Sequence, residues 1–337
     1  MSSSNKFNFF LAVLILLTIV GIVSGFNLNN SNTSLQNQSS VDNKKMIDAS
    51  SEVIQANESF VTATTSTVTD VTPSIVPQVR RITASAYLVG DVSTGKVYLS
   101  SNQNKVLPVA SMSKLMTAIV ATNKFSTTTT IEITPENASV ATDTSAVHAG
   151  EKFSFTESLY PLLLNSSNVM AEAIASTDPL ATTSTSTTTR TVQEIQQTRL
   201  EFLKTMSSTA WEVGMPATYF ADPSGLDSHN HATAKDIFAL ARYIYKFRPD
   251  IFEITRIVGV DVATTTEHDS HSFFSIHPFV KDPRFLGGKT GRTPEAGETM
   301  LTILNIDDHP IAFIVMHSSY GAREGDTNLL IDKYLAL

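Results

Sequence analysis

Apolar residues in residues 80–337 follow alternating and helical patterns, which predict strands at both ends of the region with helices between them. Strands are predicted where apolar and polar residues alternate between turn residues, at residues 84–89, 96–99, 300–306 and 311–316. Helices are predicted where apolar residues recur every three or four positions, after Pro108, at residues 169–174, from Thr233 onward and at residues 328–335. We therefore predict an α+β fold in which the N- and C-terminal strands share one sheet.

The N-terminus is predicted to target the chain to a membrane. Residues 9–23 are apolar except for Thr18 and Gly21, and Lys6 is the only charged residue before them. A membrane-spanning helix needs about 20 residues, so this segment suits either a cleaved signal peptide or a retained anchor. We favour retention and predict that residues 1–26 tether the exported chain to the extracytoplasmic face of the cytoplasmic membrane.

Two segments have the composition of a disordered chain. Residues 27–79 are mainly Asn, Ser, Thr, Gln and Val with almost no aromatic residues, so they cannot bury enough apolar surface to offset the entropy of ordering. Residues 180–191 are rich in Ser and Thr and lie within the folded region, where we expect an exposed loop insertion. The predicted organisation is therefore a linker at residues 27–79 followed by one folded domain at residues 80–337.

Composition excludes several functional classes. The 337 residues include 24 Lys and Arg against 32 Asp and Glu, which gives a net charge of 24 − 32 = −8. An acidic chain lacks the cations needed for many phosphate contacts, so we expect no nucleic-acid partner. Cysteine is absent from the sequence, which excludes disulfides, thiolate metal sites and cysteine nucleophiles.

The first candidate site is the sequence Ser-Met-Ser-Lys at residues 111–114. At the start of a helix, Ser111 and Lys114 stand three positions apart and lie on one face. A serine hydroxyl needs an adjacent base to become a nucleophile, and a lysine can serve when burial lowers its pKa. The helix N-terminus adds the backbone N–H of Ser111 for a developing oxyanion. The same four residues also suit an ordinary helix start with a solvated lysine.

Two further polar segments could join this site. Ser166 and Asn168 follow an apolar run on a turn between predicted helices, where a hydroxyl could relay a proton and a carboxamide could hold a substrate amide. Residues 287–291, Gly-Gly-Lys-Thr-Gly, precede the last strand pair. On an edge strand these glycines would let another backbone approach closely, while Lys289 and Thr290 would offer a cation and a hydroxyl to a carboxylate.

The histidines raise the alternative of a metal site, which we do not favour. The pair at residues 268 and 271 has no third ligand at a diagnostic spacing. We expect solvated loop positions, with no metal and no cofactor, for His229, His231, His268, His271 and His277. Trp211, the only tryptophan, is expected in the core.

Taken together, the three segments follow the order Ser-x-x-Lys, Ser-x-Asn and Lys-Thr-Gly, which is the signature of the serine β-lactamase and penicillin-binding protein group. The chain resembles the serine-type D-alanyl-D-alanine carboxypeptidases, the low-molecular-mass penicillin-binding proteins, over about residues 84–335. The resemblance rests on residues 108–118, 222–227, 233–236, 288–291, 296–297 and 322–324. It implies a DD-peptidase-like fold, with an antiparallel sheet of N- and C-terminal strands flanked by helices and a mostly helical lobe between them.

The resemblance also implies a mechanism. Ser111 would attack the carbonyl between the two terminal D-alanines of a peptidoglycan stem peptide, and Lys114 would take its proton. The leaving D-Ala would be protonated through the Ser166–Lys114 pair, and water would then release the acyl-enzyme. β-Lactams mimic this substrate, so they would acylate Ser111 and inhibit the enzyme.

Substrate binding is implied in the same way, for Asn168, Lys289, Thr290, Gly291, Arg292 and Arg323. Asn168 would hold the amide side of the substrate. Lys289, Thr290 and Arg323 would bind the terminal carboxylate, and Lys289 would help to keep Lys114 neutral. The backbone N–H groups of Ser111 and Arg292 would form the oxyanion hole.

Two alternative functions remain open. A DD-endopeptidase, which cuts peptidoglycan cross-links, uses the same motifs, and a β-lactam or peptidoglycan sensor would acylate and then stall. A β-lactamase is disfavoured because no Glu-x-x-x-Asn lies between Asn168 and Lys289. Residues 267–278 differ from the family's usual Asn-rich approach to Lys-Thr-Gly, which leaves the substrate selectivity open.

Overall fold

The computed structural model describes residues 81–179 and 190–337, which belong to the compact unit Pro77–Leu337. The segments predicted as a membrane anchor and a linker, residues 1–26 and 27–79, lie outside the described residues, and so does most of the insertion at 180–191. Within the described ranges, every helix is too short or too polar to cross a membrane.

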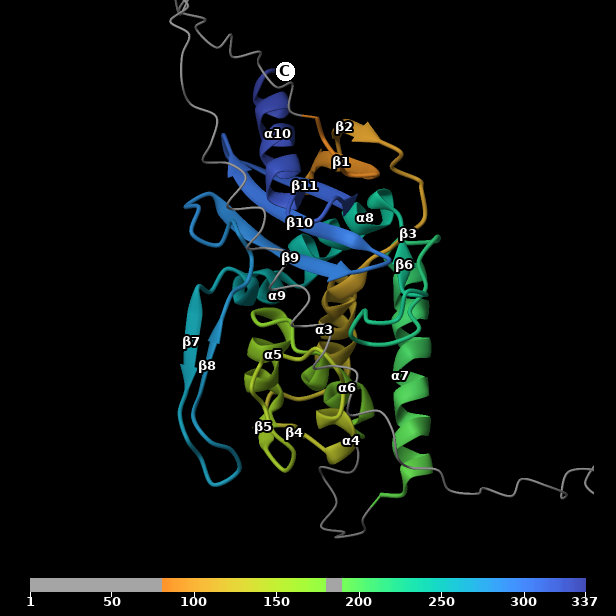
Figure 1. The fold of residues 1–337 in the computed structure, drawn as a ribbon, viewed down its shortest axis with the longest axis vertical. Helices are drawn as coiled ribbons and strands as arrows, with labels where there is room; N and C mark the ends of the chain where they lie inside the picture. Colours follow the sequence, from red (N-terminus) through yellow and green to blue (C-terminus); the bar gives the residue numbers. More distant parts are fainter. Residues whose placement is uncertain (1–80, 180–189) are drawn as a thin grey trace, which may run out of the picture. The chain divides into compact units, whose positions relative to one another are not determined.

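The centre of the fold is an antiparallel sheet of five strands in the order β2-β1-β11-β10-β9. Its strands are β1 (Ala86–Asp91), β2 (Val97–Ser101), β9 (Phe285–Thr293), β10 (Gly297–Ile306) and β11 (His309–Ser318). The first strand pairs directly with the last, with Leu88 opposite Ile314 (Figure 1). This pairing confirms the prediction that the N- and C-terminal strands share one sheet.

A tight turn joins β10 to β11, so β11 begins two residues earlier than predicted, whereas β10 ends at Ile306 as predicted and is longer at its other end. Ile306 pairs with His309, so only Asp307 and Asp308 form the turn, with φ of 51° and 64°. Turns with positive φ at both central residues match the twist of a β-hairpin, and Asp tolerates this conformation better than most residues. The strands therefore run up to the turn on both sides.

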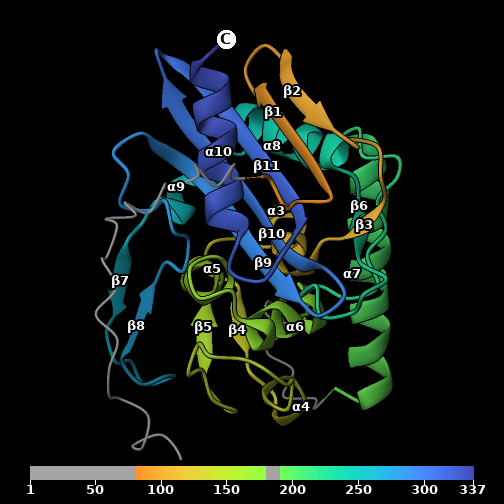
Figure 2. The ribbon, with the colours of Figure 1, turned by 45° about the horizontal axis from the view of Figure 1, so that its top comes forward.

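The two faces of the sheet bury alternate side chains under different helices. Along β10, Leu301 and Ile303 face the main hydrophobic core, whereas Met300 and Leu304 face a second cluster. The second cluster is covered by α10 (Arg323–Leu335), which begins five residues before its predicted start. The helix α8 (Ala234–Phe247) packs against β1 and β11 on the other side (Figure 2).

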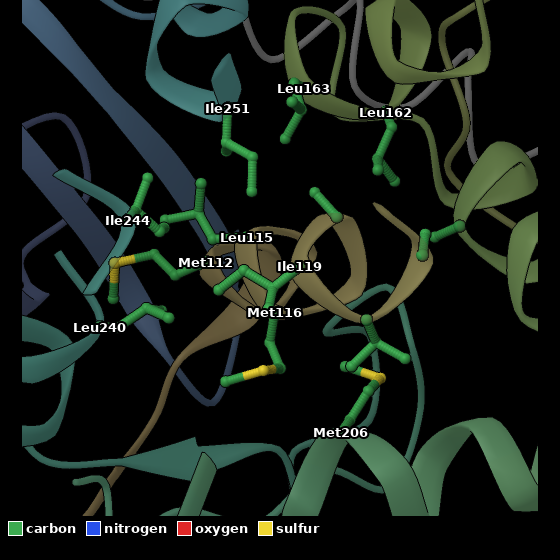
Figure 3. Packing of buried hydrophobic residues seen from close by; sticks show 14 of the residues in the cluster. Met112, Leu115, Met116, Ile119, Leu162, Leu163, Met206, Leu240, Ile244 and Ile251 are labelled. Carbon is green, nitrogen blue, oxygen red and sulfur yellow. The ribbon is translucent and has the colours of Figure 1, made fainter. Parts of the chain in front are cut away.

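Beneath the sheet, α3 (Ser113–Lys124) runs through the middle of the main core. Figure 3 shows Leu115, Met116 and Ile119 of α3 surrounded by side chains from the neighbouring helices. Those helices are α5 (Phe155–Leu163), α7 (Val192–Glu212), α8 and α9 (Pro249–Thr255). Each fully buried Leu or Ile contributes about 1.5–3 kcal/mol to the stability of the fold. Lys114, at the start of α3, and Ser111, just before it, are therefore held on a rigid element.

The remaining described elements are short and join the sheet to the helices. They are β3 (Leu107–Pro108), the 3₁₀-helix η1 (Ala110–Met112), β4 (Thr130–Glu132), α4 (Pro135–Ala138), β5 (Lys152–Ser154), α6 (Asn168–Ser176), β6 (His231–Ala232), β7 (Gly259–Val262) and β8 (His271–Phe274). Three small antiparallel ribbons result, formed by β3 with β6, β4 with β5, and β7 with β8.

Trp211 corrects one prediction, because 70% of its surface is exposed. The buried positions of α7 are Phe202, Leu203, Met206 and Ala210. These residues form a stripe at helical spacing, and Trp211 lies outside it at the last turn of the helix.

Three of the five histidines are buried, which corrects the prediction that all of them are solvated. The rings of His268 and His271 lie 4.6 Å and 5.4 Å from the ring of Phe153, and His271 Nε2 is 2.7 Å from Glu151 Oε1. His277 is the third buried histidine. These imidazoles pack against aromatic rings in the interior, a property that their spacing in the sequence does not reveal.

Candidate active site

Ser111 and Lys114 are brought together where η1 passes into α3. The Lys114 Nζ lies 3.0 Å from the Ser111 Oγ. Lys114 is fully buried, whereas Ser111 is half-buried and open on one side. The predicted stacking of these two residues on one helical face is therefore the arrangement that the structure has.

The other partners of Lys114 orient its amine. Nζ donates to Asn168 Oδ1 at 2.7 Å and to the Ser224 carbonyl oxygen at 2.6 Å. Burial lowers the pKa of Lys114 to about 7, although the carboxylates of Asp222 and Asp143 oppose this shift. A neutral amine has two N–H bonds and one lone pair. In the protonated form Nζ donates to Ser111 Oγ as well. In the neutral form the two oxygens, which can only accept, take both hydrogens, and the lone pair is left for the Ser111 hydroxyl.

Ser166 and Lys289 form a second pair. Ser166 lies in the turn between α5 and α6 with a φ of 63°, and Lys289 Nζ donates to its Oγ at 2.8 Å. Nζ also donates to the Thr290 carbonyl oxygen at 3.0 Å. Burial, followed by the charges of Lys114 and Arg323, holds the pKa of Lys289 well below its usual range. The sequence prediction paired Ser166 with Lys114, whereas the hydrogen bond that Ser166 makes in the structure is to Lys289.

Two glycines let the backbone pack tightly around Ser111. A Cβ atom on Gly291, in β9, would lie 2.9 Å from the Ser111 nitrogen. A Cβ atom on Gly225 would lie 1.9 Å from the Ala110 carbonyl oxygen. The strand β9 is an edge strand of the sheet, as predicted: among the described strands, only β10 pairs with it. Thr290 and Gly291 of this strand stand beside the nucleophile.

Arg323 and Arg292 have different surroundings. Arg323 donates from Nη1 to the Gly291 carbonyl oxygen at 3.1 Å, which fixes its guanidinium beside β9. The Arg292 side chain turns outward and donates to the Tyr320 hydroxyl at 3.2 Å. The buried carboxylate of Glu298 lies 3.9 Å from Arg292 Nη1 and accepts from the Arg323 backbone N–H at 3.3 Å.

A buried turn at residues 222–225, for which the sequence predicted no role, supports Lys114. Asp222 accepts backbone N–H groups from Ser224 and Gly225 at 2.6 Å and 2.5 Å, which holds the Ser224 carbonyl against Lys114. Asn230 donates to Ser113 Oγ at 3.0 Å and accepts from the Ala221 backbone. The Asp-Pro-Ser-Gly sequence at residues 222–225 signals such a turn, but not which side chain it faces.

The pattern of ligating side chains does not indicate a metal centre. In residues 81–179 and 190–337, no three His, Cys, Asp or Glu side chains converge as a metal ion would require.

Comparison with known proteins places this geometry in context. A family model described as D-alanyl-D-alanine carboxypeptidase matches residues 67–182 and 188–319. A D-alanyl-D-alanine endopeptidase of Pseudomonas aeruginosa is 26% identical over 247 residues, which covers 72% of this chain and 73% of that protein. A D-alanyl-D-alanine carboxypeptidase of Bacillus subtilis is 27% identical over 221 residues, which covers 63% of this chain and 51% of that protein.

A solved structure is similar over most of the described residues. The crystal structure of the Streptomyces K15 DD-transpeptidase has a TM-score of 0.67 with 20% sequence identity, and the match covers 77% of this chain and 99% of that one. This likeness confirms the α+β, DD-peptidase-like fold that the sequence predicts.

Proposed function

We propose that this chain, which belongs to the D-alanyl-D-alanine carboxypeptidase family, performs the reaction of that family with Ser111 as its nucleophile. The protein is a serine D-alanyl-D-alanine carboxypeptidase that removes the terminal D-Ala from peptidoglycan stem peptides, and β-lactams bind it. The observation that carries the residue assignment is the Lys114 amine. Its two acceptor oxygens leave the lone pair directed at the Ser111 hydroxyl.

Acylation begins when Ser111 Oγ attacks the carbonyl carbon between the two D-alanines and Lys114 takes the hydroxyl proton. The backbone N–H groups of Ser111 and Arg292 stabilise the oxyanion, and the close approach of Gly291 to the Ser111 nitrogen supports that pairing. The proton taken by Lys114 passes through the Ser166 hydroxyl to the nitrogen of the leaving D-Ala. Lys289 holds that hydroxyl in place. Water then attacks the ester carbon and returns a proton to Ser111.

Substrate recognition uses the groups around β9. Thr290, Arg323 and the Lys289 amine bind the terminal carboxylate, because Lys289 Nζ contacts the Thr290 carbonyl oxygen and Arg323 contacts the Gly291 carbonyl oxygen of the same strand. Asn168 Oδ1 is taken up by Lys114, so its amide Nδ2, now 3.4 Å from Thr142 Oγ1, is the atom available to a substrate carbonyl.

A second candidate activity is cleavage of D-Ala cross-links. The relative from Pseudomonas aeruginosa is named an endopeptidase, whereas the relative from Bacillus subtilis is named a carboxypeptidase. Both reactions form the same acyl-enzyme and differ only in the leaving group. Purified cross-linked muropeptides and pentapeptides offered in equal amounts would separate the two activities by their relative kcat/KM.

Membrane tethering is part of the proposal and rests on the sequence. The apolar residues 9–23 and the polar residues 27–79 suit an anchor and a spacer that hold the enzyme on the extracytoplasmic side, near its polymer substrate. Alkaline extraction of membranes tests this: the full chain should stay with the membrane, and a chain lacking residues 1–26 should not.

Labelling with a fluorescent penicillin tests the nucleophile. We expect one covalent adduct per protein, located by mass spectrometry on Ser111 and lost in Ser111→Ala. Ser113→Ala is the matched control, because Ser113 lies two positions away, is buried and bonds to the Ala110 carbonyl oxygen. An adduct that survives in Ser111→Ala would overturn the assignment.

A further inference from the structure

A short segment outside the three motifs, in which His277 is buried, links two parts of the active site. Residues 275–277, which we call the brace, follow β8 and run beside the turn that carries Ser166. The Ile276 backbone N–H donates to the Leu164 carbonyl oxygen at 3.2 Å, two residues before Ser166. The brace also lines a narrow gap together with Lys289 and Thr290 of β9. It therefore lies against the segment that leads to Ser166 and against the strand that carries Lys289.

The hydrogen bonds of His277 determine its tautomer. The Phe279 backbone N–H donates to His277 Nδ1 at 3.2 Å, so Nδ1 carries no hydrogen. His277 Nε2 therefore carries the hydrogen and donates it to the Leu301 carbonyl oxygen at 3.0 Å. The imidazole also packs against the Phe285 ring, with ring centroids 4.6 Å apart. Thr302 Oγ1 lies 3.5 Å from Nε2 as a second, longer contact. Both nitrogens thus have partners, which hold the ring in this orientation.

The Leu301 carbonyl lies where β10 pairs with β9, the strand that carries Lys289. Leu301 is the register partner of Lys289. A Cβ atom on Gly288 would lie 2.2 Å from the Leu301 oxygen and 2.8 Å from His277 Nε2, so only glycine fits between them. Thr255 Oγ1 accepts the Gly288 N–H at 3.1 Å on the free edge of the strand. The backbone just before Lys289 is therefore held from both sides.

Charge explains why an imidazole suits this position. Burial lowers the pKa of His277 to about 3 with smaller contributions from Lys289 and Arg323, although the hydrogen bond to Leu301 opposes this shift. His277 is therefore neutral at any pH at which the enzyme would work. It donates a hydrogen bond next to the Lys289 strand without placing another cation beside two existing ones.

We propose that His277 is a positioning residue for the reaction. Its Nε2–H bond to Leu301 sets the place of the Lys289 backbone, and the rest of the brace sets the place of the Ser166 turn, so that Lys289 Nζ meets Ser166 Oγ. This inference rests on the proposed function, because it concerns the group that passes the proton to the leaving nitrogen.

Three substitutions separate the possible roles of the ring. His277→Gln keeps a donor near the Nε2 position, His277→Asn keeps an acceptor near the Nδ1 position, and His277→Phe fills the space with neither. Ile276→Ala is the matched control, because this side chain is half exposed and the backbone N–H stays in place. The measured quantities are the acylation rate constant with a fluorescent penicillin, its pH dependence, and the fraction of molecules labelled at completion.

We expect His277→Phe and His277→Asn to acylate about 10- to 100-fold more slowly, which is the effect expected when a catalytic group is displaced by about 1 Å. The labelled fraction should stay complete, and the acid limb set by Lys114 should stay near pH 7. His277→Gln should recover most of the rate, and Ile276→Ala should match the unchanged protein. A loss of labelled fraction in proportion to the rate would mean a merely structural role and would overturn the proposal.

The ¹⁵N chemical shifts of the His277 ring give a test that does not depend on activity. A neutral imidazole with its hydrogen on Nε2 from pH 5 to pH 8 is expected. A charged ring or a hydrogen on Nδ1 would contradict the inference about His277. A full chain that shows the expected tautomer but takes no penicillin on Ser111 would instead contradict the proposed function.

Discussion

Lys114 shows how one buried residue acquires a catalytic property from its neighbours. Its amine is fully buried, so the charged form is disfavoured, and its two oxygen acceptors leave the lone pair for Ser111. The charge of Lys114 in turn lowers the pKa of the neighbouring Lys289. Burial thus makes a base out of Lys114, a residue type that is normally protonated at neutral pH.

This account predicts how acylation depends on pH. Because burial lowers the pKa of Lys114 from 10.5 to about 7, the amine can accept the Ser111 proton only above that value. The second-order rate constant for penicillin acylation should therefore rise through an acid limb with a midpoint near pH 7 and fall about tenfold per unit below it. A stopped-flow profile from pH 5.5 to pH 8.5 measures this, and a flat profile would contradict the role of Lys114.

At the scale of single residues, the sequence predicted the reactive side chains better than the groups that hydrogen-bond to them. The three-residue spacing of Ser111 and Lys114 follows from helix geometry alone. The Ser224 carbonyl could not be predicted, because a backbone oxygen 110 positions away carries no signature of its own. His277 was missed for a related reason: its neutrality depends on burial, which only the folded chain creates.

At the scale of elements, the site depends on how closely three segments approach one another. The strand β9, the 3₁₀-helix η1 and the turn at residues 222–225 meet around Ser111, and glycines allow the contacts. The sequence predicted the edge strand and the turn before α6, since both have strong local patterns. It missed α7, whose mean composition is polar and whose apolar stripe is only a few residues long, although the start of this helix has a capping box at Thr191 and Glu194.

A pair of glycine substitutions tests this close approach. Gly225 has a φ of 89°, and a Cβ atom there would meet the Ala110 carbonyl oxygen at 1.9 Å. Gly150 has a similar φ of 92° with no atom within 4 Å of its Cβ position. Both alanine variants should lose about 1–2 kcal/mol to the unfavourable backbone conformation.

Only Gly225→Ala should also displace Ser111, because its clash is with the residue before the nucleophile. We expect its acylation rate to fall at least tenfold beyond that of Gly150→Ala. Penicillin labelling and thermal unfolding of both variants provide the comparison. Equal acylation rates in the two variants would show that the packing of η1 does not place the nucleophile.

For the whole described unit, the fold is closed by contacts between residues far apart in the sequence. The strand β1 pairs with β11, and Asp326 in α10 accepts from the Thr83 backbone N–H and hydroxyl, each at 2.8 Å. The shared sheet could be predicted because both ends have strand patterns. The link between Thr83 and Asp326 could not, because a Thr and an Asp 243 positions apart have no detectable periodic relation.

Removing that link should affect stability and spare catalysis. Asp326→Ala removes the two hydrogen bonds that the buried Asp326 carboxylate accepts from Thr83, which should cost about 1–3 kcal/mol of unfolding free energy. Asp332→Ala, on an exposed position of the same helix, is the control and should change little. Urea unfolding measures the first effect and penicillin acylation the second. A large change in the acylation rate of folded Asp326→Ala would mean that the closure also shapes the active site.

The central claim is that Ser111, activated by Lys114, cleaves the bond between two terminal D-alanines. Its most direct test is the release of D-alanine from diacetyl-Lys-D-Ala-D-Ala by the full chain in detergent, with Ser111→Ala and Lys114→Arg as controls. We expect release by the unchanged protein and losses of at least about 1,000-fold in both variants. Release that persists in Ser111→Ala, or a protein that neither releases D-alanine nor takes penicillin on Ser111, would contradict the account.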